Sequence, residues 1–73
     1  MTFDAEKFAS RLRSRRAEIG ITQQDLAESS ELSPSTIFRY ESAESAPSVE
    51  SLLALCFSLK TSPSWLLGYE SAA

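Results

Sequence analysis

The chain has 73 residues, a net charge of −3, one cysteine, Cys56, and no histidine. This composition allows one domain with a small core and excludes an internal disulfide, the common zinc patterns and the usual nucleophile–base pairings, so we expect a binding module, not an enzyme, without metal or cofactor. No apolar run approaches the roughly 20 residues of a membrane span, and the N-terminus lacks the order of a signal peptide, so we expect a soluble cytoplasmic protein.

The first predicted helix runs from about Asp4 to Ile19, because apolar residues recur there at helical spacing. Its apolar stripe consists of Ala5, Phe8, Leu12 and Ile19. Arg16 lies on the same stripe although it is charged. Gly20 is placed to end the helix in a left-handed conformation.

Two short helices follow, over about residues 23–42. Thr22 can cap the first of them, with Asp25 three residues on as in a capping box. Ser33 and Pro34 supply a cap and a proline at the first position of the next helix, which therefore begins at Pro34. The spacing turns Ile37 and Tyr40 toward the core. This pair has the lengths and the short turn of a helix-turn-helix.

A fourth helix begins after the cap Ser48, with the sequence VESLLALCFSLK. Its expected buried stripe consists of Val49, Leu52, Leu55, Cys56 and Leu59. A short fifth helix follows the cap Ser62 and ends at Gly68. We expect the tail, about residues 69–73, to be frayed.

The order of these motifs resembles the DNA-binding domain of the lambdoid phage repressor and Cro family. The resemblance is carried by RLRSRRAEIGITQQDLAE before the turn and by IFRYE, PSVESLLALCFSL and SPSWLLG after it, so it covers nearly the whole chain. It implies a compact, all-α, five-helix lambda-repressor-like domain over residues 1–73. It also implies a transcription regulator that binds double-stranded DNA.

The same resemblance implies which residues contact DNA. Gln23 would reach a phosphate from the start of the second helix, unless it is merely exposed to solvent. The third helix would present residues to base edges and nearby phosphates, namely Ser33, Pro34, Ser35, Phe38 and Arg39. Arg39 could read guanine or clamp a phosphate, and Phe38 or Pro34 could pack on a thymine methyl group. Phe38 could instead belong to a protein contact.

Five of the seven basic residues lie in the first helix, within ten positions. We expect Arg13 and Arg15 to contact flanking phosphates, and Lys7 and Arg11 to lie on a solvated side. The resemblance pairs Arg16 with Glu41, which would join the first helix to the third, and a half-buried guanidinium without a partner would be costly. Phosphate binding is the alternative or additional role of Arg16.

Three positions depart from the family pattern. Glu31 stands in the turn where glycine is usual, and a side chain at positive φ costs about 1 kcal/mol. Ala43 replaces a second frequent glycine, and Glu44 lies in a loop that is often basic in relatives. These changes predict weak binding to random DNA.

A single recognition helix reads few base pairs, so we expect a homodimer on a palindromic operator. Ala54 and Phe57 fall on the side of the fourth helix away from its core stripe. With Trp65 and Leu66 they form a candidate two-fold interface, although the last two could instead close the core.

The sequence therefore predicts a phage- or prophage-type repressor that occupies an operator overlapping a promoter, with no small-molecule ligand. Two alternatives remain open. One is a protein-interaction module on the same fold that engages a regulator or polymerase through Phe38 and Phe57. The other is the antitoxin of a toxin–antitoxin pair.

Overall fold

The computed structural model describes residues 2–69, and in that part of the chain it contains helices and no strands. The helices are α1 (Ala5–Ile19), α2 (Gln23–Ser30), α3 (Pro34–Glu41), α4 (Val49–Leu59) and α5 (Pro63–Leu66). The predicted all-α, five-helix fold is thereby confirmed. Of the tail that we expected to fray, residues 70–73 lie outside the described residues, whereas the Tyr69 hydroxyl donates a hydrogen bond to the Thr2 carbonyl.

Every helix in residues 2–69 begins at a side-chain cap, and these caps are Asp4, Thr22, Ser33, Ser48 and Ser62. The predicted capping box is present. The Asp25 N–H donates to the Thr22 hydroxyl oxygen, and the Thr22 N–H donates to the Asp25 carboxylate, each at 3.0 Å. Because caps satisfy otherwise unpaired N–H groups, local sequence signals fix where the helices start.

The helix ends use left-handed residues, of which only some are glycine. Gly20, at φ 85°, ends α1 as predicted. Glu31, at φ 58°, ends α2, and Ala43 adopts φ 63° just beyond α3. The positive φ expected at Glu31 is thus confirmed, and the strain of a side chain in this conformation is present in the turn between α2 and α3.

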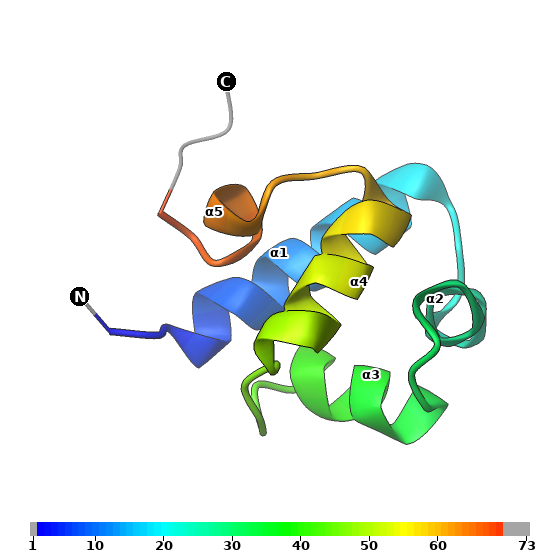
Figure 1. Ribbon diagram of the computed structural model, residues 1–73, viewed down its shortest axis with the longest axis horizontal. Helices are drawn as coiled ribbons and strands as arrows, with labels where there is room; N and C mark the ends of the chain where they lie inside the picture. The colour runs from blue at the N-terminus through cyan, green and yellow to red at the C-terminus, as the bar shows by residue number, and fades with distance from the viewer. Residues whose placement is uncertain (1, 70–73) are drawn as a thin grey trace.

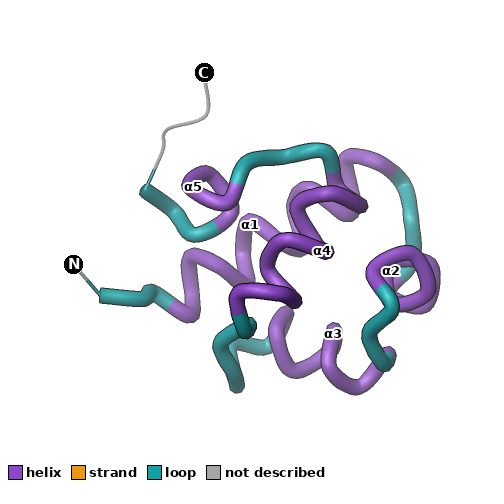
Figure 2. The backbone as a smooth tube through the Cα atoms, in the orientation of Figure 1, coloured by secondary structure: helices purple, strands orange, loops and turns teal. Residues whose placement is uncertain are grey.

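Helix α1 is the element around which the others pack. It contacts α3, α4 and α5, while α2 packs against α3 and α4. The largest fully buried side chains come from all five helices: Phe8, Leu12, Leu26, Ile37, Leu55, Leu59 and Leu66. Figure 1 shows α2 and α3 together at one end of the molecule, with α5 at the other, and Figure 2 shows the short loop that joins α2 to α3. The helix-turn-helix pair is therefore held in place by packing against α1 and α4.

Two residues expected in the core are instead exposed. Val49 is 74% exposed and Ile19 is 40% exposed. Val49 is the first residue of α4 and Ile19 the last of α1. The apolar spacing continues to the end of each helix, but the neighbouring helices do not extend that far. Both side chains are therefore exposed to solvent.

Candidate nucleic-acid interface

Helix α3 has one anchored face and one open face. Ile37 and Tyr40 are buried, and Tyr40 packs edge-on against Phe8 of α1 at 5.7 Å between ring centroids. The residues of α3 and its N-cap that were predicted to face DNA are all exposed: Ser33, Pro34, Ser35, Phe38 and Arg39. The helix thus presents these side chains on a backbone that packing holds in place.

The hydroxyl groups of this open face already have partners within the chain. The Ser33 hydroxyl accepts from the Thr36 N–H at 3.2 Å and lies 3.2 Å from the Ser35 hydroxyl. The Ser42 hydroxyl lies 2.8 Å from the Phe38 carbonyl and 2.6 Å from a Glu44 carboxylate oxygen. The Arg39 guanidinium, in contrast, has no hydrogen bond or ion pair to any residue in the range 2–69, so its donors are available to a ligand.

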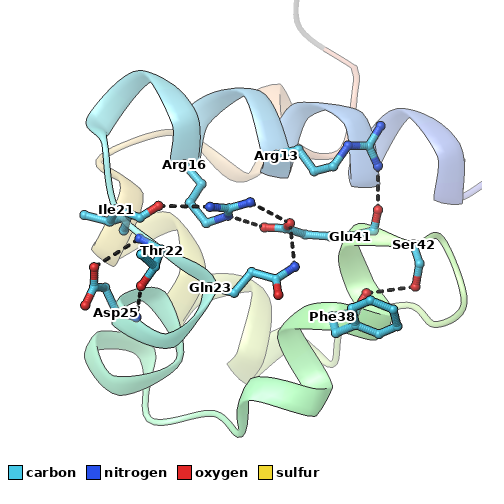
Figure 3. A network of polar contacts seen from close by, with 9 residues as sticks. All are labelled: Arg13, Arg16, Ile21, Thr22, Gln23, Asp25, Phe38, Glu41 and Ser42. Atoms are coloured by element: carbon cyan, nitrogen blue, oxygen red, sulfur yellow. Dashed lines mark hydrogen bonds and ion pairs between the residues drawn. The ribbon is translucent and has the colours of Figure 1, made fainter.

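Glu41, the last residue of α3, joins three helices through its carboxylate. Arg16 of α1 donates to it twice, from Nε to Oε2 at 2.6 Å and from Nη2 to Oε1 at 3.0 Å. Gln23 Nε2, at the start of α2, donates to Glu41 Oε1 at 3.0 Å (Figure 3). The structure therefore brings Arg16 and Glu41 together, and the hydrogen bond to Glu41 raises the pKa of Arg16.

This arrangement limits what Gln23 can offer to DNA. One N–H of its carboxamide is used by Glu41, and its oxygen is an acceptor that cannot bond to a phosphate. One N–H remains. Gln23 is half-buried at the N-terminus of α2, where backbone N–H groups also favour an anion.

Three arginines of α1 bind backbone carbonyls at the ends of other helices, and we call Arg11, Arg13 and Arg15 the clamp arginines. Arg13 Nη1 donates to the Glu41 carbonyl at the end of α3, at 2.5 Å. Arg15 Nε donates to the Leu59 carbonyl at the end of α4, at 2.8 Å, and Arg15 also pairs with Glu18 at 2.6 Å. These bonds satisfy carbonyls that the helix itself leaves unpaired.

Arg11 binds α5 in the same manner. Its Nη1 donates to the Trp65 carbonyl at 2.6 Å, and its guanidinium lies 4.9 Å from the centroid of the Trp65 ring. The expectation that Arg11 lies on a solvated side is therefore wrong. No signal in the sequence near these arginines could have shown it, since the carbonyls lie between 28 and 54 residues away.

The outer face of α4 carries a row of exposed apolar residues, which we call the α4 ridge. It consists of Val49, Leu53 and Phe57, which are 74%, 54% and 88% exposed and recur every four residues. Beside it, an apolar groove of about 830 Å³ runs between α4 and the start of α5, lined by Leu53, Cys56, Phe57, Lys60, Thr61, Ser62 and Pro63. Sequence reasoning found Phe57 but missed Val49, which it assigned to the core, and Leu53.

The other predicted interface residues lie elsewhere. Leu66 has no exposed surface and belongs to the core, so its assignment to an interface was wrong. Trp65 is half-buried beside Arg11. Ala54 lines a separate pocket next to the turn between α2 and α3, which it shares with Glu31 and Glu50. Of the four residues expected there, Phe57 is the one on the α4 ridge.

Residues 2–69 provide neither a cluster of metal ligands nor a membrane-spanning helix. No group of three His, Cys, Asp or Glu side chains there is arranged to hold a metal ion. None of the described helices is both long and apolar enough to cross a membrane.

Comparison with known proteins identifies the same architecture. The helix-turn-helix family matches residues 12–66. The restriction-modification controller protein C.AhdI from Aeromonas hydrophila is 33% identical, with a TM-score of 0.82 over 86% of this chain and 96% of that one. The P22 c2 repressor, solved in complex with a synthetic operator, is 35% identical, also with a TM-score of 0.82 and the same coverage of both chains, 86% and 96%.

A third similar structure is the clp gene regulator ClgR from Corynebacterium glutamicum. It is 35% identical, with a TM-score of 0.80 over 86% of this chain and 67% of that one. No curated protein sequence matches the chain.

Proposed function

The chain belongs to the helix-turn-helix family of DNA-binding transcription regulators, of the lambdoid repressor and Cro type, and from this premise we propose that it represses transcription by occupying an operator. The observation that carries the proposal is the open face of α3, with its available Arg39 and exposed Phe38 on a helix anchored by Ile37 and Tyr40. An α-helix of this kind fits the major groove of B-DNA.

In this proposal α3 lies in the major groove and α2 crosses the sugar-phosphate backbone. The free N–H of Gln23 binds a phosphate at the N-terminus of α2, and Ser33, Pro34 and Ser35 face base edges and nearby phosphates. Arg39 reads a guanine, since its guanidinium matches the O6 and N7 acceptors of that base.

Arg13 and Arg15 are secondary parts of the same proposal. Each guanidinium has five N–H donors, and the carbonyls of α3 and α4 occupy only some of them. Contacts with flanking phosphates would use the remaining donors. We assign both residues first to the clamps and only then to DNA.

We further propose that two copies associate through the α4 ridge on a palindromic operator. In an antiparallel pairing of two α4 helices with the two-fold axis at Leu53, Val49 of one copy meets Phe57 of the other, because both lie four residues from Leu53. The ridge is therefore complementary to itself in its apolar surface.

We also propose that the protein is a cytoplasmic binding protein and has no enzymatic activity. The described residues provide hydrogen-bond donors for a ligand, and they contain no nucleophile paired with a histidine base. The experiment that tests it is the selection of bound sequences from a random duplex library at two salt concentrations. We expect a palindromic sequence to be enriched, and Arg39→Ala to lower the affinity for it by about ten- to a hundredfold and to relax specificity at one position.

Lys7→Ala is the matched control, because it removes the same charge beside Gly68, away from α3. We expect it to change the affinity by less than about twofold. If the folded protein enriches no sequence, the repressor proposal fails and a protein-binding role on the same fold replaces it.

A further inference from the structure

Phe38 is the one large apolar side chain exposed on the helix-turn-helix pair in residues 2–69. The other exposed large apolar residues lie in the chain ends, at the end of α1 or on the α4 ridge: Phe3, Ile19, Val49, Leu53, Phe57 and Tyr69. Phe38 is 56% exposed. An apolar ring held in water on the face that would enter a groove needs an apolar partner there.

The surroundings of Phe38 leave its ring prominent. Ser35 of α3 lies one turn before it and Ser42, the C-cap residue of α3, lies one turn after it, and both side chains are small. The Ser42 hydroxyl is turned back onto the Phe38 carbonyl and the Glu44 carboxylate. Figure 3 shows the ring outside the network formed by Arg16, Glu41 and Gln23. The ring is therefore free to meet a ligand first.

The major groove offers one apolar group among its base edges, the C5-methyl group of thymine. The other groups on the groove floor are hydrogen-bond donors and acceptors, and a phenyl ring over them would remove water without replacing its bonds. The hydroxyl groups of Ser33 and Ser42 are already hydrogen-bonded within the chain, which reduces what they can offer in place of that water. An edge carrying a methyl group is thus the surface that fits Phe38.

We propose that Phe38 reads the C5-methyl group of one thymine in each half-site, one or two base pairs from a guanine read by Arg39. Phe38 and Arg39 are successive residues, about 1.5 Å apart along α3 and about 100° apart around it, which places their targets on neighbouring base pairs. This inference rests on the proposed DNA binding and adds the chemical group that is recognised.

The test replaces thymines of the selected operator, one symmetric pair at a time, with deoxyuridine. This change removes only the methyl group and keeps base pairing. We expect one pair of positions to be sensitive, with a loss of about fourfold per half-site and about fifteenfold for both. Replacing thymines that flank the selected operator serves as the control and leaves the affinity unchanged.

Protein variants assign the effect to Phe38. Phe38→Ala binds thymine and deoxyuridine operators equally, whereas Phe38→Leu retains the difference. Thermal unfolding checks that both variants are folded. We expect them to be, because the Phe38 side chain is exposed and contributes little to the core.

Three outcomes overturn the inference, and they are distinguishable. If no position is sensitive to the methyl group, or if Phe38→Ala keeps the full sensitivity, the assignment of Phe38 is wrong while operator binding stands. If no operator is selected at all, the proposed function fails and the inference falls with it.

Discussion

Glu41 combines two kinds of contact in one buried residue. Its carboxylate binds Arg16 and Gln23, and its backbone carbonyl accepts from Arg13. The residue is 5% exposed. A buried carboxylate is tolerated when it is paired and fully hydrogen-bonded, and removing one partner then leaves an uncompensated charge.

We therefore expect Arg16→Ala to lower the free energy of unfolding by about 3 kcal/mol, and the melting temperature by more than about 10 °C. DNA affinity also falls, because Gln23 loses the fixed carboxylate that orients it. Circular dichroism melting checks the first effect, with Lys7→Ala as a control for loss of charge alone. An unchanged melting temperature would contradict a stabilising role for the pair.

At the scale of the elements, the turn between α2 and α3 is destabilised by backbone strain. Glu31 occupies a left-handed conformation, at φ 58°, that a glycine adopts without strain. We expect Glu31→Gly to raise the free energy of unfolding by about 1 kcal/mol, which corresponds to about 4–8 °C in a domain of this size.

Glu31→Ala separates the backbone effect from the charge. It removes the same carboxylate but keeps a side chain at positive φ, so its melting temperature should stay close to that of the wild type. Equal stabilisation by Ala and Gly would show that charge repulsion, and not backbone strain, limits the turn.

The elements also show what a sequence can and cannot predict. Caps, prolines and left-handed ends are local signals, and so the span of the helix pair and the start of α3 at Pro34 were predicted correctly. Val49 was assigned to the core because its spacing continues the α4 stripe, but burial depends on whether another helix reaches that far. The partners of Arg11 and Arg13 lie in distant helices, so only the folded chain reveals them.

At the scale of the whole molecule, the proposed dimerisation through the α4 ridge is open to direct measurement. We expect Phe57→Glu to yield a folded monomer, because the new carboxylate of each copy would be buried against the apolar ridge of the other copy. Molar mass from light scattering checks this at several concentrations. The α4 ridge is short, so the wild type should dissociate in the micromolar range.

Ile19→Glu is the matched control, since it also places an acid at an exposed apolar position, but one at the end of α1 and outside the α4 ridge. Its molar mass should equal that of the wild type. Equal masses for the wild type and Phe57→Glu would exclude the ridge as the interface.

The clamp arginines have a consequence for how the protein finds its target. They commit much of the positive charge of α1 to holding helix ends, and residues 23–41 contain one basic residue, Arg39. Sliding along random DNA depends on loosely held cations that follow the phosphates. On the proposed operator, a chain with few of them would search mainly by free diffusion, so occupancy of the operator would follow the number of molecules in the cell more than the length of DNA around the site.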